Sequence, residues 1–344
     1  MSSLQPVDDT TYRQLAAGFP LPIEQAPVWA RFDAVVEGRE HWGRLVYRDD
    51  SGTPAAVVSL TAQRGPGGFR YLWAKNGPVW FVEPTPEREA DLRRLLAESL
   101  RRVDPRLVFV RLHAMHEAPD LRPLLQGITY DRTVIVDLDR SPEEIFAAMK
   151  QQGRRAIRKA LKDESLTVTE ETGLDEEAFA ELYDVFVETA QREGFGPHPA
   201  RRYLDMLRTL GPEHARVFVT RRDGRVLAWA LVLVNDGAAV YSVGASNAEA
   251  RKAYAADLLH WRIIQTLQVD GVRSYDLAGA GSERFPGLSG LTQFKTKFEK
   301  EITEVAPAWD MPLKPRAYAA LVRALAAKRR LTAQVRELRG RLSR

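Results

Sequence analysis

The order of apolar and polar positions predicts two similar series of strands and helices. The first series has strands at 44–48, 55–62 and 69–73, a helix at about 87–102, and a strand at 107–112. The second has strands at 215–220, 225–234 and 239–245, a helix at about 254–269, and a strand at 274–278. A turn with glycine, Gly52 or Gly224, joins the first two strands of each series. Because the order returns at an offset of about 170 residues, two related α/β halves are predicted, with a chance similarity of two unrelated halves as the alternative.

The remaining segments predict a linker and two ends. Trp29, Phe32 and Val36 recur at helical spacing and share one packing face. A strand at 133–138 leads to Ser141-Pro-Glu-Glu, which has the cap, proline and acidic first turn of a helix running to about Leu161. Further helices are expected at 175–192, from 200, and at 318–344. We therefore expect domains at 1–140 and 141–312, each α+β with a mixed central sheet, and a basic helical extension at 313–344.

Composition narrows the class of protein. The chain has 344 residues, 44% hydrophobic and 28% charged, as in ordinary globular proteins. It has no cysteine, which excludes disulfides, thiolate metal sites and a cysteine nucleophile. No apolar run approaches the roughly 20 residues of a membrane span, and the first residues do not resemble a secretory leader. A soluble, cytoplasmic protein is expected. A net charge of +4 permits polyanionic partners without requiring them.

The C-terminal stretch carries most of its charge as arginine. Leu321, Leu325, Leu331, Val335, Leu338 and Leu342 recur at three to seven residues. Between them stand Arg323, Lys328, Arg329, Arg330, Arg336, Arg339, Arg341 and Arg344, with Glu337 as the acid. The pattern indicates a basic amphipathic arm. A solvated packing helix or a small coiled coil is the alternative.

The segment Leu288–Lys300 is the strongest candidate for chemistry. It follows an apolar strand and a connection containing Gly279, Gly281, Gly287 and Gly290. Within it Phe294 and Lys295 are adjacent, and an aromatic ring beside a cation suits the end of a nucleotide. A surface helix with solvated lysines and one core phenylalanine is the alternative interpretation.

Familiar catalytic motifs are absent from the sequence. There is no phosphate-binding G-x-x-x-x-G-K-[ST] loop, no strand-linked G-x-G-x-x-G, no H-E-x-x-H and no G-x-S-x-G. The six histidines lack helical metal spacing, and His113 and His116 are expected to be structural. No metal site is predicted.

A strand and helix of this type invite comparison with acyl-coenzyme A N-acyltransferases. Those enzymes hold the pyrophosphate at a helix N-terminus behind an [RQ]-x-x-G-x-[GA] loop. Here the corresponding residues are Arg251-Lys-Ala-Tyr-Ala-Ala256, so Ala253 replaces the glycine and Tyr254 would crowd a pyrophosphate. The acyl donor is therefore expected to be something other than coenzyme A.

Several segments in order resemble the FemABX family of aminoacyl-tRNA-dependent peptidyltransferases, which build peptidoglycan interpeptide bridges. The resemblance spans roughly residues 25 to 312. Its segments are Trp29, Tyr71-Leu-Trp-Ala-Lys-Asn-Gly-Pro78, Asp137-Leu, Met149-Lys, Arg154-Arg-Ala-Ile-Arg-Lys-Ala, Thr189-Ala-Gln-Arg-Glu-Gly-Phe195, Tyr241-Ser-Val-Gly-Ala-Ser246, Leu258-Leu-His-Trp261, Gly271-Val-Arg-Ser-Tyr-Asp-Leu-Ala-Gly279 and Gly290-Leu-Thr-Gln-Phe-Lys-Thr-Lys-Phe298. Membership implies tandem acetyltransferase-like (GNAT-type) domains, which agrees with the repeat.

The resemblance also implies roles for individual residues. Phe294 would stack on the terminal adenosine of tRNA, and Lys295 would neutralise a phosphate and the developing oxyanion. Arg201, Arg202, Tyr203, Tyr241 and Lys75 would bind the anionic acceptor, with a surface-arginine role for Arg202 and a core role for Tyr241 as alternatives. Arg154, Arg155, Arg158 and Lys159 would meet tRNA phosphates, with a solvated basic face as the alternative.

Two departures from the family pattern matter. Glu299 stands where the family usually has glycine, and a carboxylate near a tRNA end is unfavourable unless Lys297 or Lys300 offsets it. Arg31 and Asp33 flank Phe32 where the family often has lysine, which weakens the expected diphosphate contact of the first domain. The basic C-terminal helix is an addition to the family pattern.

The sequence thus predicts an aminoacyltransferase that moves an amino acid from aminoacyl-tRNA to an amine of a peptidoglycan precursor. No cofactor is expected beyond aminoacyl-tRNA as co-substrate. The acceptor would be a muropeptide linked to uridine diphosphate or to lipid. A monomer with transient contact at the inner face of the plasma membrane is expected. The alternatives are an N-acyltransferase of the same fold with another donor or acceptor, and a non-catalytic binder of nucleic acid or membrane surfaces.

Overall fold

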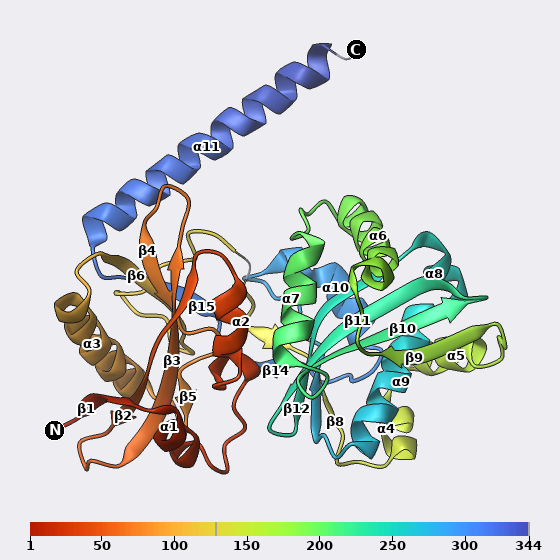
Figure 1. Ribbon diagram of the computed structural model, residues 1–344, viewed down its shortest axis with the longest axis horizontal. Coiled ribbons are helices and arrows are strands. Elements are labelled where there is room, and N and C mark those ends of the chain that lie inside the picture. The colour runs from red at the N-terminus through yellow and green to blue at the C-terminus, as the bar shows by residue number, and fades with distance from the viewer. Residues whose placement is uncertain (128, 343–344) are drawn as a thin grey trace. The chain divides into compact units, whose positions relative to one another are not determined.

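The chain folds into two compact units, which are described separately (Figure 1). The computed structural model describes residues 1–127 and 129–342, with side-chain surroundings through Leu331. Unit 1 comprises residues 1–15, 38–129 and 306–344, and unit 2 comprises residues 16–37 and 130–305. These units differ from the expected division at 140/141 and 312/313. Segment 16–37 belongs to unit 2 because its helix packs there, and the chain re-enters unit 1 after residue 305.

Unit 1 is built on a mixed sheet. Its strand order is β1-β2-β3-β4-β6-β15, and β5 pairs with β3. The strands are β1 (Ser3–Val7), β2 (Arg39–Arg48), β3 (Pro54–Arg64), β4 (Arg70–Trp73), β5 (Val79–Trp80), β6 (Leu107–His113) and β15 (Ala308–Pro312); the helices are α1 (Asp9–Leu15), α3 (Pro86–Val103) and α11 (Pro315–Leu342). The strand β15 follows the whole of unit 2 in sequence and pairs antiparallel with β6.

Unit 2 has a second sheet of the same kind, ordered β8-β13-β12-β11-β10-β9. Its strands are β8 (Ile135–Asp137), β9 (Leu166–Glu171), β10 (Ala215–Arg222), β11 (Arg225–Asn235), β12 (Ala238–Ser246) and β13 (Ser274–Asp276), and β7 (Arg132–Thr133) pairs separately with β14 (Thr303–Glu304). Its helices are α2 (Trp29–Val35), α4 (Pro142–Ala148), α5 (Gln151–Ala160), α6 (Glu176–Glu193), α7 (Ala200–Leu210), α8 (Ala248–Ala253), α9 (Ala255–Val269) and α10 (Ser289–Lys295), with short 3-10 turns at Ile23–Gln25 and Pro286–Leu288.

The two sheets share one topology, which confirms the predicted repeat. In unit 1, β2, β3 and β4 pair antiparallel in succession, and β4 then pairs parallel with β6 across α3. In unit 2, β10, β11 and β12 pair antiparallel, and β12 pairs parallel with β13 across α8 and α9. A parallel pair needs a crossover, and a helix supplies it in both units.

Alternating side chains give each sheet two buried faces. In unit 1, Val110 of β6 packs with Leu96 of α3 on one face of the sheet. Its neighbour in β6, Phe109, packs with Tyr318 of α11 on the other face. In unit 2, Phe218 of β10 lies in the cluster with α9, and Val217 lies in the cluster with α6 and α7. Each sheet is therefore covered by helices, as its apolar strands require.

One expected helix is in fact two. The pattern predicted a single helix from Ser141 to about Leu161, but α4 ends at Ala148 and α5 begins at Gln151. Met149 between them is extended and fully buried. The Arg154 guanidinium donates hydrogen bonds to the carbonyl oxygens of Ala147 and Met149, which have no partners within the helix. The break is stabilised by tertiary packing, which periodicity cannot report.

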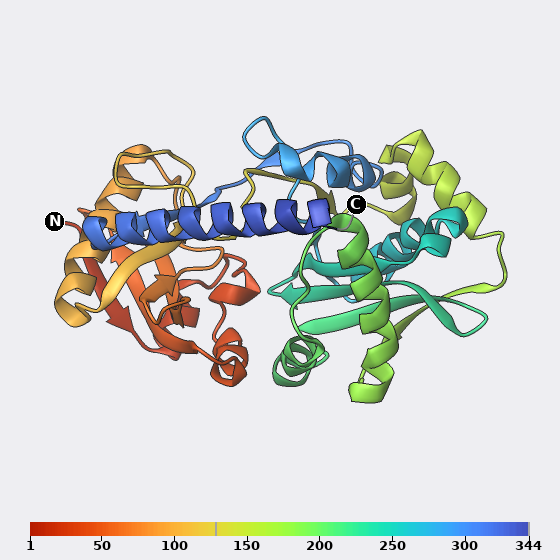
Figure 2. The same ribbon diagram turned by 90° about the horizontal axis from the view of Figure 1, so that it is seen from above.

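The C-terminal helix α11 is a single unbroken helix (Figures 1 and 2). Tyr318 anchors its first turns in a cluster with Val108, Phe109 and Leu125. Of the expected basic arm, Arg336, Arg339, Arg341 and Arg344 lie outside the residues whose side chains are described. Among the described helices, none is both long enough and apolar enough to cross a membrane.

Candidate active site

The Phe294–Lys295 pair closes α10, next to the loop that follows β13. The Oγ1 atom of Thr292 in α10 accepts a hydrogen bond of 2.7 Å from the amide of Gly281. A side chain at Gly281 would bring a Cβ to 2.6 Å from the amide nitrogen of Ser289, so glycine is required for this approach. The loop and the helix are thus fastened to each other directly before the pair.

Lys295 is a buried cation held by two carbonyl groups. Lys295 is 5% exposed. Its Nζ donates hydrogen bonds to the carbonyl oxygens of Ala278 at 2.9 Å and Gly279 at 2.6 Å. Ala278 has a φ of 60°, which is unusual for alanine. Its amide donates a 2.7 Å hydrogen bond to Oδ1 of Asp276. Asp276 therefore fixes the loop whose carbonyls hold the ammonium.

Burial and charge act on this ammonium in opposite directions. Burial lowers the pKa of Lys295 to about 8, and the carboxylate of Asp276 opposes that change. Burial raises the pKa of Asp276, against the hydrogen bonds from Thr133 Oγ1 and the Ala278 amide and the charge of Lys295. At neutral pH most Lys295 side chains still carry a proton, so the site holds a positive charge.

Aromatic rings surround the pair and meet at His260. The His260 ring contacts Tyr241, with ring centroids 4.6 Å apart, and Phe294, with centroids 5.4 Å apart. Its Nδ1 lies 3.1 Å from the hydroxyl of Tyr275. Burial lowers the pKa of His260 to about 3, with the charges of Lys295 and Lys297 acting in the same direction. The imidazole is therefore neutral and links Phe294 to the central strand.

A β-bulge directs Tyr241 toward this centre. Leu231 pairs with Val243 and Val232 with Tyr241, so Ser242 is the extra residue in β12. A Cβ at Gly244 would lie 1.5 Å from the Tyr241 hydroxyl oxygen, so the tyrosine occupies space that only glycine leaves free. Burial raises the pKa of Tyr241 to about 12, and the hydroxyl keeps its proton.

The segment that replaces a coenzyme A loop is helical and pairs with the chain's own side chains. Residues 248–253 form α8, and Tyr254, at a φ of 56°, separates α8 from α9. In the first turn of α9, the buried carboxylate of Asp257 pairs with Lys297 Nζ at 2.6 Å. The same ammonium lies 5.1 Å from the centre of the Phe294 ring. A helix N-terminus favours negative charge, and here Asp257 provides it.

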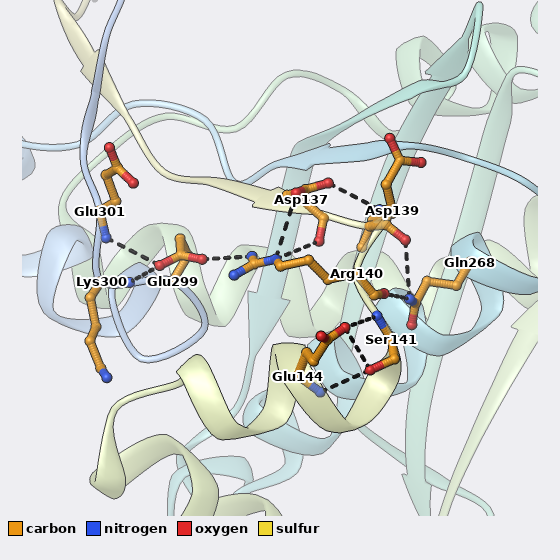
Figure 3. A network of polar contacts seen from close by, with 10 residues as sticks. Asp137, Asp139, Arg140, Ser141, Glu144, Gln268, Glu299, Lys300 and Glu301 are labelled. Atoms are coloured by element: carbon orange, nitrogen blue, oxygen red, sulfur yellow. Dashed lines mark hydrogen bonds and ion pairs between the residues drawn. The ribbon is translucent and has the colours of Figure 1, made fainter.

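The carboxylate of Glu299 is neutralised, but by a residue other than those expected (Figure 3). Its Oε2 pairs with the Arg140 guanidinium at 2.7 Å. Lys297 pairs with Asp257 instead, and Lys300 contributes its backbone amide to Glu299, not its ammonium. Arg140 holds the pKa of Glu299 below its usual value against the opposing effect of burial. The expected conflict at Glu299 is removed by the segment between β8 and α4.

The basic residues of α5 differ in their contacts, and both Arg155 and Arg158 are exposed. Arg154 caps the end of α4, as described above, and Arg158 lies over the Phe146 ring at 5.2 Å. The helix itself is fixed to the end of α10, because a Cβ at Gly153 would lie 2.8 Å from the carbonyl oxygen of Lys297. Contact of these arginines with tRNA stays a prediction.

Among the expected acceptor residues of unit 2, Tyr241 reaches this centre through His260, whereas Arg201, Arg202 and Tyr203 lie on α7. Tyr203 is buried at 6% exposure in the cluster on the α6 and α7 face, where its ring packs on Phe179. Arg201 is exposed and lies 3.7 Å from Asp205. Arg202 also lies on α7, and Lys75 lies in unit 1, just after β4. The structure gives Tyr203 a packing role, and acceptor binding by these residues stays a prediction.

The two candidate histidines of unit 1 are structural, as expected. A ring nitrogen of His113 lies 2.8 Å from the Ala306 carbonyl oxygen, and one of His116 lies 2.8 Å from that of Pro84. In the described part of the chain, no group of three or more His, Cys, Asp or Glu residues is arranged to hold a metal ion.

Sequence reasoning did not single out Asp276, Tyr275, His260 or Asp257. Asp276 and Tyr275 had a usable signal, because polar residues at the carboxyl end of a parallel strand often reach a functional site. His260 and Asp257 stand in an apolar helix and gave no comparable signal. Their contacts depend on the packing of α9 against α10.

Comparison with known proteins agrees with this architecture. A family model described as an acetyltransferase (GNAT) domain matches residues 147–287. A UDP-N-acetylmuramoylpentapeptide-lysine N(6)-alanyltransferase from Weissella viridescens is 23% identical over 298 residues, which cover 80% of this chain and 85% of that protein. The crystal structure of FemX superposes with a TM-score of 0.72 at 13% identity, covering 93% of this chain and 100% of that one.

The chain is therefore similar over most of its length to a Fem-type alanyltransferase, and it has the fold of FemX. A tandem GNAT protein from the clavulanic acid biosynthesis pathway shares the fold, with a TM-score of 0.54 at 14% identity over 91% of this chain and 99% of that one. The expected tandem acetyltransferase-like architecture of this chain is therefore confirmed. The matched GNAT segment contains His260, Asp276 and the β12 bulge.

Proposed function

We propose that this protein transfers an amino acid from aminoacyl-tRNA to an amine of a peptidoglycan precursor stem peptide. The similarity to the alanyltransferase from Weissella viridescens and the fold shared with FemX support the reaction class. The observation that carries the proposal within this chain is the buried Lys295 ammonium beside Phe294. An acyltransferase fold whose coenzyme A segment holds its own carboxylate, Asp257, favours a different activated donor.

The proposed chemistry needs little covalent assistance from the protein, because the aminoacyl ester is already activated. The acceptor amine attacks the ester carbonyl carbon and a C–N bond forms. The carbonyl oxygen becomes an oxyanion until the C–O bond to the ribose breaks. The amine loses a proton, and the released ribose hydroxyl gains one. Positioning and stabilisation of the oxyanion are the tasks left to the enzyme.

Lys295 is suited to stabilise the oxyanion, and Phe294 is suited to position the donor. The carbonyls of Ala278 and Gly279 use two of the three Lys295 N–H groups, which leaves one for a phosphate or the oxyanion. Phe294 is half-buried, held between His260, Phe298 and Lys297, so its ring is fixed before a base stacks on it. A fixed donor in a dry setting stabilises developing charge more strongly than a mobile one.

The proposal is tested by transfer from charged tRNA to muropeptide precursors linked to uridine diphosphate or lipid. We expect Lys295→Ala to lower kcat by about 10²- to 10³-fold, the usual loss of one oxyanion donor. Lys300→Ala is the matched control, because this exposed lysine lies in the same segment and only its backbone amide joins the Glu299 network. It should retain wild-type rates.

Two results would reject the proposal. One is the absence of tRNA-dependent transfer to every stem-peptide acceptor. The other is full transfer activity in a folded Lys295→Ala protein. Transfer that proceeds without tRNA would instead identify an N-acyltransferase with another donor. A monomeric state and a transient contact with the inner face of the plasma membrane stay predictions.

A further inference from the structure

The positive charge of the chain is concentrated in its C-terminal helix. Residues 313–344 contain ten of the 50 Lys and Arg residues and one of the 46 Asp and Glu residues. This segment therefore carries a formal charge of +9, and the other 312 residues carry −5, which together give the net +4. The net charge of +4 is thus the sum of an acidic segment, residues 1–312, and a strongly basic C-terminal helix. Such asymmetry is typical of a polyanion-binding element.

Three arginines of α11 form one row. Arg316, Arg323 and Arg330 are spaced by seven residues, so they lie on one side of the helix about 10.5 Å apart. All three are exposed. The sequence has no Asp or Glu between residues 313 and 336, and the acid of this helix, Glu337, stands seven residues beyond Arg330, after the end of the row. We call Arg316, Arg323 and Arg330 the arginine row.

The arginine row faces away from the surface on which α11 docks. Leu321 and Leu325 pack toward Val108 and Phe109 of β6. Arg323 is two residues from both leucines and hence about 200° around the helix from each. The row is therefore on the solvent side of a helix whose first turns are anchored, and it is presented on a firm support rather than a loose tail.

The described part of α11 fits a nucleic-acid backbone better than a lipid surface. Its exposed large apolar residues are Val322 at 44% and Leu331 at 62%. They are nine residues apart, about half a turn out of phase, and form no common apolar stripe. A helix that lies in a membrane interface needs such a stripe. Binding to a phosphate backbone needs only spaced cations, which the arginine row supplies.

We propose that the arginine row of α11 binds the phosphate backbone of the tRNA body, away from the aminoacyl end that reacts. This inference rests on the proposed function, because that function makes tRNA the donor. It adds a second point of attachment for a substrate much larger than its reacting end. The attachment is electrostatic, so it should be sequence-independent and should weaken steeply with salt.

The test is the affinity of the full chain for deacylated tRNA as salt is varied. We expect Arg316→Gln/Arg323→Gln/Arg330→Gln to weaken binding at least about tenfold at roughly 0.1 M salt, and to reduce the slope of log K against log salt by about 2 to 3. The matched control is Lys314→Gln/Lys328→Gln/Arg329→Gln, which removes the same charge. Lys328 and Arg329 are three and four residues from Leu325 and so lie on its side of the helix.

The outcomes separate the candidate partners. Equal losses in the two triple variants would overturn the proposal, because charge alone and not the row would matter. Unchanged tRNA affinity in the row variant would also overturn it. If the row variant then lost binding to vesicles of anionic phospholipid, the partner of the row would be a membrane surface. Far-ultraviolet circular dichroism and thermal unfolding should match wild type in both variants.

The test also separates this inference from the proposed function. Binding of deacylated tRNA requires no transfer, so row-dependent binding without transfer to any acceptor would uphold the row and reject the function. If transfer occurs, the row variant should transfer more slowly than wild type from intact aminoacyl-tRNA. From a short aminoacylated acceptor-end fragment, both proteins should transfer at the same rate. Equal rates of both proteins with intact tRNA at subsaturating concentration would count against the row.

Discussion

At the scale of single residues, Asp276 has the most informative position. It receives hydrogen bonds from Thr133 and from the amide of Ala278, and it faces the charge of Lys295. It thus fixes both the position of the two carbonyls that hold Lys295 and the proton affinity of the ammonium. We describe it as a positioning residue, since it acts through Lys295.

Replacing Asp276 should change the pH dependence of transfer. Activity that needs protonated Lys295 falls as pH rises through its pKa of about 8. Asp276→Asn keeps the shape and the acceptor oxygen but removes the charge that raises this pKa. We therefore expect the alkaline limb of kcat/KM to move to lower pH, as measured between about pH 6 and 9.

The other charged and titratable groups near Lys295 give the control its meaning. They include Lys297, the neutral rings of His260, Tyr241 and Tyr275, and Glu24, whose charge acts on Asp276, and none of them is altered. Asp139→Asn removes one exposed charge from the same unit and should leave the limb in place. A lower rate with an unmoved limb would mean that Asp276 only supports the fold of the loop.

Residue pairs also show where sequence reasoning ended. The Phe294–Lys295 pair could be selected from its residue types and from the family resemblance. The partner of Glu299 could not, because Arg140 is 159 residues away in the chain. Lys297 and Lys300 were the natural candidates by proximity in sequence, and their ammonium groups do not take that role. Ion pairs between distant segments depend on the packed fold.

At the scale of elements, the contact between α5 and the end of α10 depends on a glycine. The amide of Lys150 donates a 3.0 Å hydrogen bond to the carbonyl oxygen of Lys297, and Gly153 allows this approach. Its conformation is ordinary for a helix, so glycine is retained there for space and not for backbone freedom. A methyl group would push α5 from the segment that carries the candidate site.

Two glycine substitutions should therefore have opposite effects. Gly153→Ala should lower the free energy of unfolding by about 1–3 kcal/mol through overpacking, despite the better helix propensity of alanine. Gly290→Ala in α10 meets no atom within 4 Å and should raise it by up to about 1 kcal/mol. Urea unfolding monitored by circular dichroism measures both. Stabilisation by Gly153→Ala would contradict the close contact.

Helices and strands were predictable to different degrees. Long periodic helices such as α3, α6 and α9 and the strands of both repeats follow from apolar spacing. The short helix α8 was missed, and the break between α4 and α5 was missed. In both cases the reason is local: Tyr254 in a left-handed conformation ends α8, and the Arg154 guanidinium stabilises the end of α4. Periodicity does not encode either interaction.

At the scale of the whole molecule, the return of the chain to unit 1 is secured by a buried ion pair. Asp310 of β15 is fully buried and accepts hydrogen bonds from Arg111 at 2.7 and 3.1 Å. It also accepts from the amide of Leu125 and the hydroxyl of Tyr318. One carboxylate thereby joins β6, β15, α11 and the loop that contains Leu125.

Loss of this carboxylate should be costly. Asp310→Ala leaves the guanidinium of Arg111 buried without its partner, so we expect a loss of about 3–5 kcal/mol in the free energy of unfolding. Glu304→Ala is the control, because it removes an exposed pair with Arg132 at 3.7 Å and should cost less than about 1 kcal/mol. Thermal and urea unfolding would report both. A small effect at Asp310 would mean that β15 is held mainly by its backbone pairing.

The domain division is the part of the architecture that sequence could not supply. The repeat was visible because each half has its own apolar pattern. The assignment of 16–37 to unit 2 and of 306–344 to unit 1 was not visible. The pattern of a short segment does not indicate which of two similar sheets it joins. Trp29 and Trp309 are equally apolar, and only their packing distinguishes their units.

The late return of β15 has a consequence for synthesis on the ribosome. Unit 1 contains the first residue of the chain, yet its sheet lacks an edge strand until Pro312 has left the exit tunnel. All of unit 2 is translated before that point. Chains usually fold in the order in which their domains emerge, but here the unit that starts first must finish last. Until then Arg111 has no Asp310, and the nascent first unit exposes the apolar surface that Trp309 and Met311 will cover. We therefore expect the half-made chain to aggregate more readily than the finished one.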